Sequence, residues 1–183
     1  MPRFFDIIFS FCGILILSPI LLILLIGGII DTGAPIFFQK RLGKNKKEFT
    51  LFKFRSMNLE TNSLATHLVN ANAITHWGKI IRTLKLDELP QLFNVLNGDM
   101  SLVGPRPNLP NQSELIKERE ARNVYSVRPG ITGLSQINKV DMSTPKLLAE
   151  MDSKMIQNFS TLNYFKYLFL TLSGKGFGDR ARY

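Results

Sequence analysis

The chain has 183 residues, of which 23 are Lys or Arg and 14 are Asp or Glu, so its formal net charge is +9. A single cysteine excludes an intrachain disulfide and a cysteine-based zinc site, and 14 Phe argue against a disordered chain. The length predicts one domain, residues 1–183, with a membrane segment at 7–30 followed by the remaining part at 31–183.

Residues 7–30 form a run of 24 positions without a charged side chain. As a helix, this run is roughly 36 Å long, enough to cross a hydrocarbon core of about 30 Å. A signal peptide has a shorter apolar region and ends at small residues, which Asp31-Thr32-Gly33 does not provide. The pattern therefore predicts a membrane helix.

Ser18 and Pro19 lie at the midpoint of this run. Proline removes a backbone donor and clashes with the carbonyl of Leu15, and the Ser18 hydroxyl can bond a freed carbonyl. Two interpretations stay open: a kinked helix that spans the membrane, and a re-entrant helix-break-helix that returns to the face it entered.

The charges on either side of the run bear on its topology. Residues 40–60 hold seven basic and two acidic residues, so the positive-inside rule places them in the cytoplasm. Arg3 stays on that same side only if the helix is re-entrant. The seven basic residues are Lys40, Arg41, Lys44, Lys46, Lys47, Lys53 and Arg55.

Two short strands are expected at 36–39 and 49–54, joined by a basic turn at 43–47, as a β-hairpin near the membrane surface. Helices are predicted at 77–84, at 87–96 (ending at Asn97-Gly98) and, charged and exposed, at 112–123. Residues 58–76 are predicted as helix and loop, and 99–110 and 128–133 as loops.

The C-terminal third has apolar residues at helical spacing from Leu147 to Phe169. Residues 164–172 are apolar nearly all round, which suits either the core or the membrane interface. The predicted fold class is α+β and mainly helical, with a small β-hairpin and interfacial amphipathic helices around a compact domain.

Asp87 and Glu88 precede Pro90, a residue that fits the first turn of a helix. Acidic residues at a helix N-terminus favour the helix dipole, and this alone would explain the pair. The functional alternative is a nucleophilic or metal-binding pair of carboxylates at a helix end that also attracts phosphate.

Several basic residues have unusual neighbours. Lys53 and Arg55 share one face of a predicted strand by alternation, and Arg82 precedes Asp87 by five residues. Arg106 and Arg128 each lie beside proline, which lowers the entropy lost when an arginine is ordered. These groups are suited to a diphosphate, although each taken singly is also explained as solvated surface charge.

Taken together, the motifs resemble the bacterial sugar transferase family, the monotopic phosphoglycosyl transferases. The resemblance covers nearly the whole chain and looks like the minimal version of that family. Residues 139–163 match less well, and they contain the stretch from Met151 to Ile156 where the family often has aromatics. The matching stretches are Ser18-Pro19, PIFFQKRLGKNKKEFTLFKFRSM at 35–57, LDELPQLFNVLNGDMSLVGPRP at 86–107 and RPGITGLSQIN at 128–138.

The resemblance implies a re-entrant helix broken at Ser18-Pro19, and a protein on the cytoplasmic face of a bacterial inner membrane. It implies transfer of a phosphosugar from a UDP-sugar to undecaprenyl phosphate, with release of UMP. Asp87 would be the nucleophile that forms a covalent phosphosugar intermediate, and Glu88 would support a Mg²⁺ ion, so that both carboxylates are candidate metal ligands. The positions implied to bind substrate are Lys53, Arg55, Arg82, Gln91, Pro105, Arg106, Pro107 and Arg128.

The partners expected are the two substrates and membrane lipids; a homo-oligomer is left open, and no nucleic acid is expected. A membrane-anchored nucleic-acid-binding protein would explain the charge of +9, but not the GPRP and DELPQ motifs. A membrane-anchored scaffold is the other rival, and it would tolerate replacement of Asp87.

Overall fold

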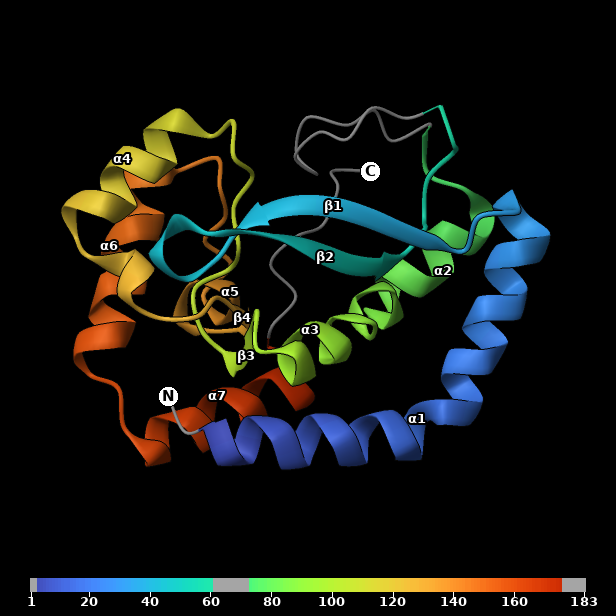
Figure 1. The fold of residues 1–183 in the computed structure, drawn as a ribbon, viewed down its shortest axis with the longest axis horizontal. Helices are drawn as coiled ribbons and strands as arrows, with labels where there is room; N and C mark the ends of the chain where they lie inside the picture. Colours follow the sequence, from blue (N-terminus) through green and yellow to red (C-terminus); the bar gives the residue numbers. More distant parts are fainter. Residues whose placement is uncertain (1–2, 61–72, 176–183) are drawn as a thin grey trace.

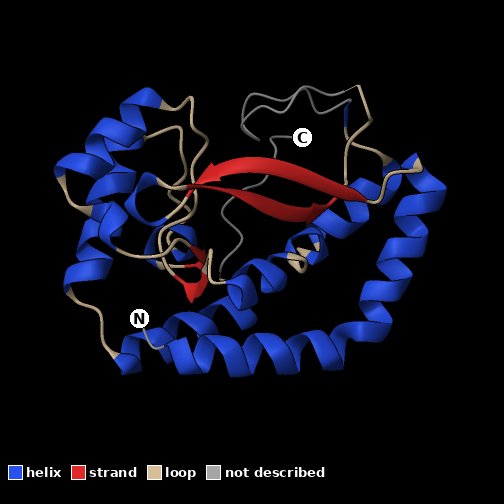
Figure 2. Ribbon diagram, in the orientation of Figure 1, coloured by secondary structure: helices blue, strands red, loops and turns tan. Residues whose placement is uncertain are grey.

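The computed structural model describes residues 3–60 and 73–175. Helices predominate in these ranges, and the longest strands form one small hairpin (Figure 2), as the predicted fold class requires. The expected helix and loop at 58–76 lie largely outside the described residues. The helices are α1 (Arg3–Thr32), α2 (His76–Thr83), α3 (Gln91–Asn97), α4 (Ser113–Ala121), α5 (Leu134–Ile137), α6 (Pro145–Gln157) and α7 (Thr161–Leu172); the strands are β1 (Ile36–Leu42), β2 (Glu48–Phe54), β3 (Ser101–Val103) and β4 (Gly130–Thr132).

Helix α1 contains the predicted membrane segment and is long and apolar enough to cross a membrane. Pro19 lies inside it, and Figure 1 shows the helix bending sharply about half way along. The Ser18 hydroxyl donates a 2.8 Å hydrogen bond to the carbonyl of Leu15, the group that Pro19 leaves without its usual donor. The predicted local chemistry of the break is therefore confirmed.

Both ends of α1 pack against the rest of the chain. At the first end, the Arg3 guanidinium donates to the carbonyls of Val95 (2.5 Å) and Leu96 (2.9 Å) in the last turn of α3. At the other end, Gly28 lies so close to Pro35 that an added Cβ would come within 2.8 Å of the proline Cβ. The two arms of α1 thus bracket one side of the molecule (Figure 1).

Asp6 fastens the first arm through a second set of contacts. Its carboxylate is buried, and Oδ1 accepts hydrogen bonds from Ser101 Oγ (3.0 Å), Leu102 N (3.0 Å) and Tyr164 Oη (2.9 Å). Because these donors lie on β3 and α7, a single carboxylate joins α1 to two elements of the globular part.

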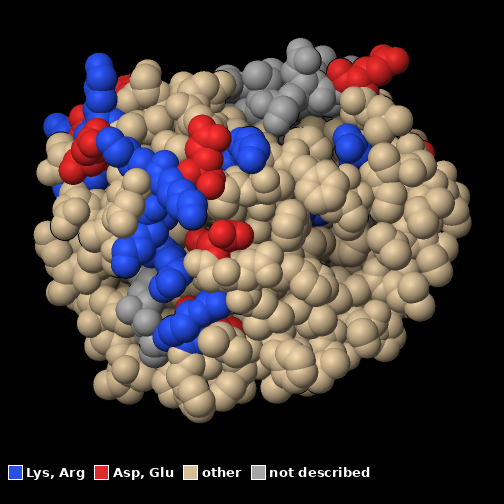
Figure 3. Space-filling model, viewed as in Figure 1, with Lys and Arg blue, Asp and Glu red and all other residues tan. Residues whose placement is uncertain are grey.

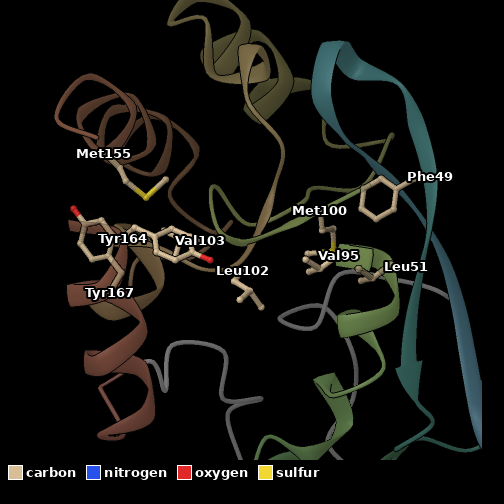
Figure 4. Close-up of a cluster of buried hydrophobic side chains, with 9 residues drawn as sticks. All are labelled: Phe49, Leu51, Val95, Met100, Leu102, Val103, Met155, Tyr164 and Tyr167. Atoms are coloured by element: carbon tan, nitrogen blue, oxygen red, sulfur yellow. The ribbon is translucent and has the colours of Figure 1, made fainter. Parts of the chain in front are cut away.

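The hairpin has the predicted position but is longer than predicted. β1 and β2 pair antiparallel from Ile36 opposite Phe54 to Leu42 opposite Glu48, and a 3₁₀ turn at Lys44–Lys46 joins them. Its inner face contributes to the main apolar cluster, in which side chains of β2 meet those of α3, β3, α6 and α7 (Figure 4). This cluster consists of Phe49, Leu51, Val95, Met100, Leu102, Val103, Met155, Tyr164 and Tyr167.

Two segments expected to be loops contain strands. Ser101–Val103 and Gly130–Thr132 are β3 and β4, which pair in parallel with Ser101 opposite Gly130 and Val103 opposite Thr132. Three residues are too few to show the alternation from which strands are predicted. The prediction of loops throughout 99–110 and 128–133 is therefore wrong.

The expected exposed helix at 112–123 corresponds to α4, most of whose residues are exposed, but one face of it is buried. Leu115 and Arg119 lie one turn apart on one face and are both buried. Helix α7 buries one set of side chains and exposes another. Tyr164 and Tyr167 are buried, whereas Leu162, Phe169 and Leu172 are largely exposed.

Candidate active site

Asp87 and Glu88 lie in a 3₁₀ turn, Leu86–Glu88, which precedes α3. The predicted helix at 87–96 therefore begins four residues late, at Gln91. Two backbone features explain this: Lys85 is left-handed (φ 56°), and Pro90 has no N–H to continue a helical ladder. The two carboxylates stand one turn ahead of the helix instead of inside its first turn.

Glu88 is the acceptor for two cations that come from distant parts of the chain. Lys53 Nζ on β2 lies 3.0 Å from Glu88 Oε1, and Arg106 Nη2 lies 2.9 Å from the same oxygen. Burial alone would raise the pKa of Glu88, but Arg106 and Lys53 outweigh it and hold the pKa well below its usual range. Glu88 is therefore a fixed negative charge, and it orients the Lys53 ammonium and the Arg106 guanidinium beside Asp87.

Asp87 is buried as well, with 9% of its surface exposed, yet no group in residues 3–60 and 73–175 donates a hydrogen bond to its carboxylate. Burial raises the pKa of Asp87 to about 6, and the charge of Glu88 adds to this, whereas Lys53, Arg82 and Arg106 act in the opposite direction. A desolvated carboxylate without donors is a stronger nucleophile than a hydrogen-bonded one, and it ionises near neutral pH.

Lys53 and Arg55, which are expected to share one face of the strand, lie in different environments. Lys53 contacts the dyad, whereas Arg55 Nε donates to the carbonyl of Ala34 (2.9 Å) and its guanidinium lies over the Phe37 ring, 5.4 Å from the centroid. Arg55 is not among the charges with the largest effects on the pKa of either acid. The structure therefore brings Lys53, but not Arg55, to Asp87 and Glu88.

Arg82, on the last turn of α2, is close enough to lower the pKa of Asp87. Its Nη1 lies 3.4 Å from Ser56 Oγ, a long contact that leaves the guanidinium near the carboxylate. Gln91 is the first residue of α3 and is buried beside the turn that holds the dyad.

The loops that carry Arg106 and Arg128 lie against each other. The Gly130 amide donates to the carbonyl of Pro105 (2.8 Å), and an added Cβ at Gly104 would lie 2.6 Å from the carbonyl oxygen of Arg128. Only glycine permits this approach of two backbones. Arg128 Nε donates to the carbonyl of Gly98 (2.7 Å), at the end of α3 opposite the dyad.

Charged side chains are unevenly distributed over the molecular surface. Figure 3 shows blue and red atoms gathered on the left of the view, where Figure 1 places α4, α6 and one end of the hairpin. The right edge, formed by the second arm of α1, is almost entirely tan. The dyad and its cations thus belong to a molecule with a polar side and an apolar side.

The model of the family described as bacterial sugar transferase matches residues 1–175. The chain belongs to this family. It is 41% identical to the uncharacterized sugar transferase EpsL of Bacillus subtilis, over 94% of this chain and 85% of that protein. It is 37% identical to the undecaprenyl-phosphate glucose phosphotransferase of Komagataeibacter xylinus, over 98% of this chain but only 36% of that protein.

A third relative also carries a sugar phosphotransferase name. The UDP-N-acetylgalactosamine-undecaprenyl-phosphate N-acetylgalactosaminephosphotransferase of Aeromonas hydrophila is 36% identical over 96% of this chain. The chain spans 44% of that relative's length, so it matches one part of a longer protein.

The magnesium ion implied by the family resemblance is compatible with the residues present. Lys53 and Arg106 both contact Oε1 of Glu88, so Oε2 has no donor within the described part of the chain, and neither does the Asp87 carboxylate. Those residues contain no cluster of three or more His, Cys, Asp or Glu side chains. Two open carboxylates suit Mg²⁺, which is held by one or two carboxylates together with substrate phosphates and water.

The structure also reveals residues that the sequence pattern did not single out. Arg41, Asn108, Arg119 and Asp152 are all buried and contact the Arg106 loop or one another. Arg119 follows Leu115 by four residues, so helical spacing from an apolar residue could have placed it on the inner face. Nothing comparable in the sequence pairs it with Asp152.

Proposed function

We propose that this chain transfers a sugar phosphate from a UDP-sugar to a polyprenol phosphate, undecaprenyl phosphate in bacteria, and releases UMP. The observation that carries the proposal is the buried Asp87 carboxylate, which has no donor among the described residues and stands beside the Lys53–Glu88–Arg106 cluster. Relatives whose printed names specify undecaprenyl-phosphate sugar phosphotransferases add support.

The reaction consists of two displacements at one phosphorus atom. An Asp87 oxygen attacks the β-phosphorus of the UDP-sugar, and the bond from that phosphorus to the bridging oxygen breaks, so that UMP leaves with this oxygen. The resulting acyl phosphate links Asp87 to the sugar phosphate. An oxygen of the polyprenol phosphate then attacks the same phosphorus and restores the free carboxylate, so the two substrates use one phosphate site in turn.

The basic residues stabilise the charge that develops on the phosphate oxygens. Lys53 and Arg106, aimed by Glu88, would contact the transferred phosphate, and Arg82 would contact a neighbouring oxygen. Arg128 uses Nε on Gly98, so its terminal nitrogens are the groups proposed to bind the nucleotide phosphate. Gln91 follows the dyad at the start of α3, and Pro105 and Pro107 flank Arg106, so we assign these three residues to the borders of the substrate site; Arg55, held by the Ala34 carbonyl and Phe37, is not assigned a direct contact with the phosphates.

Mg²⁺ held by Asp87 and Glu88 would neutralise the diphosphate and polarise the bond that breaks. The chain itself supplies the nucleophile, the cations and a site largely withdrawn from water. In such a site each electrostatic contact is stronger than it would be in bulk solvent.

We infer that α1 is re-entrant and that the protein lies on the cytoplasmic face of the inner membrane. Arg3 and Asp6 fasten the first arm to the globular part, while Gly28 packs on Pro35 at the other end. Both ends of the helix therefore meet the same body, which a straight spanning helix does not allow. The exposed apolar residues of α7, Leu162, Phe169 and Leu172, extend the proposed lipid-facing surface.

Trapping the covalent intermediate tests the proposed function. The purified protein, incubated with UDP-sugars labelled in the sugar and without acceptor, should retain label that hydroxylamine releases, as expected of an acyl phosphate. Asp87→Asn should retain none, whereas Asp141→Asn, a change at an aspartate of a distant turn, should label normally. Labelling of Asp87→Asn to the wild-type extent would show that another residue is the nucleophile.

Thiol accessibility tests the topology. Once Cys12 is replaced, cysteines at residues 2 and 45 should both resist a membrane-impermeant thiol reagent in intact cells, and both should react after lysis. Pro19→Leu restores the backbone donor and should move the first end outside. Labelling of residue 2 alone in the wild-type background would establish a spanning helix.

A further inference from the structure

Arg119 and Asp152 form a buried ion pair between α4 and α6. Arg119 Nη2 and Nε lie 2.6 and 3.0 Å from Asp152 Oδ2, and both side chains are almost fully buried. Ser135 Oγ donates to the second carboxylate oxygen at 2.9 Å. The donors, Arg119 on α4 and Ser135 on α5, are both buried, so the guanidinium has a fixed orientation.

The third guanidinium nitrogen of Arg119, Nη1, faces the loop that carries Arg106. Its Nη1 donates to the carbonyl of Arg106 itself (2.8 Å) and to Asn108 Oδ1 (3.0 Å). The next carbonyl, that of Pro107, accepts from Arg41 Nη1 (2.9 Å), and the carbonyl of Asn108 accepts from the Leu42 amide (3.0 Å). Three successive carbonyls are therefore each held by a donor from another element.

A second ion pair also links α4 and α6. Arg122 and Glu150 join the same two helices at the surface, with 3.3 Å between Nη2 and Oε1. A buried ion pair is expensive to desolvate, and apolar residues of similar volume often stabilise a fold as well or better. Stability alone therefore does not account for the choice of a buried ion pair at this position.

We propose that Arg119 and Asp152 are positioning residues that set the Arg106 guanidinium for the transferred phosphate. This inference rests on the proposed function. Asp152 orients Arg119, Arg119 fixes the Arg106 carbonyl, and the Arg106 side chain then meets Glu88 at 2.9 Å. A displacement of about 1 Å at a group that contacts the reacting phosphate is enough to lower turnover up to a hundredfold.

The test compares three variants of the full chain in detergent with UDP-sugar and undecaprenyl phosphate. Arg119→Met combined with Asp152→Leu replaces the pair by apolar side chains and should keep the thermal midpoint near that of the wild type. Arg119→Lys keeps the charge but lacks the planar set of donors. Arg122→Ala removes the surface pair between the same helices and is the matched control.

We expect kcat/KM for the UDP-sugar to fall about ten- to a hundredfold in the double variant and in Arg119→Lys, because Arg106 is no longer held. KM for undecaprenyl phosphate should stay within about twofold of the wild type, and Arg122→Ala should behave as the wild type in both assays. A folded double variant with wild-type donor kinetics would overturn the positioning role, as would a loss confined to KM for undecaprenyl phosphate. A wild type that releases no UMP from any UDP-sugar would overturn the proposed function, and this inference with it.

Discussion

Asp87 and Asp152 are both withdrawn from solvent, but their surroundings differ. Asp152 accepts hydrogen bonds from two nitrogens of Arg119 and from Ser135 Oγ. Asp87 accepts none from the residues that the structure describes, although three cations lie close enough to affect its pKa. The Asp152 carboxylate is hydrogen-bonded by its neighbours. The Asp87 carboxylate is surrounded by positive charges but accepts no hydrogen bond from the described residues.

The difference separates a structural acid from a reactive one. A carboxylate whose lone pairs are occupied by donors is a weak nucleophile, and its removal leaves buried donors without partners. A carboxylate that is desolvated and has no donors costs stability when ionised but keeps its lone pairs available. The chain supports both kinds of acid within one fold, and Arg106 connects their surroundings: its side chain contacts Glu88, and its carbonyl accepts from the Arg119 that pairs with Asp152.

The largest expected effect is on turnover. Asp87→Asn should lower UMP release by at least about a thousandfold, because the amide has the same shape but is not an anionic nucleophile. Glu88→Gln should keep residual activity, since it weakens charge-assisted bonds to Lys53 and Arg106 that are worth a factor of about ten to a hundred. Single-turnover assays on protein whose folding has been checked by circular dichroism would measure both.

The comparison also requires that Asp152→Asn keep the covalent step. Measured per folded molecule, that variant should still form the labelled adduct, only more slowly. Complete loss of the adduct in folded Asp152→Asn, with Asp87→Asn still active, would reverse the assignment of the two acids.

The effects on stability should have opposite signs. Asp152→Asn leaves Arg119 as a buried charge without its partner and should lower the free energy of unfolding by about 3–5 kcal/mol. Asp87→Asn, measured at pH 8 without divalent metal, should raise it by about 1–3 kcal/mol, because ionised Asp87 is disfavoured by burial. Urea unfolding monitored by circular dichroism would give both values.

The direction for Asp87 follows from proton linkage. Its pKa is raised from 3.8 to about 6 in the folded state, so between these values the folded chain binds more protons than the unfolded one. The free energy of unfolding therefore falls as the pH rises through this window. The gain from Asp87→Asn should disappear below about pH 4; a gain that persists there would have another cause.

Much of this site could be predicted from sequence, because its signals are local. The apolar run with Ser18-Pro19 indicates a helix that is kinked or broken at its midpoint, and alternation in 49–54 indicates the strand that presents Lys53. The motif at 86–107 carries both the dyad and Arg106, whose side chains the structure joins through Glu88. These features depend on neighbours in the chain, which a pattern can show.

The supporting contacts depend on tertiary structure and could not be predicted. Arg119 and Asp152 are separated by 33 residues, and each lies in a helix with several other charged residues. Which charges turn inward depends on how α4 meets α6. The same reason hides the contact of Arg3 with α3 and the short strands β3 and β4, whose pairing is their only signal.

The smallest expected effect is a shift in the pH dependence of catalysis. Because Asp87 must be ionised to attack, kcat/KM should decline about tenfold per pH unit below about pH 6, the pKa to which burial raises this group.

Arg82 lowers the pKa of Asp87, so Arg82→Gln should move the acidic limb to higher pH. Bound Mg²⁺ also favours the ionised carboxylate, so raising free Mg²⁺ should move the limb to lower pH. The equivalent limb in Arg122→Ala should not move, since that residue is not among the charges with the largest effects on Asp87 and pairs instead with Glu118 and Glu150. A wild-type limb that ignores Mg²⁺ would remove Asp87 from the metal site while leaving its role as nucleophile intact.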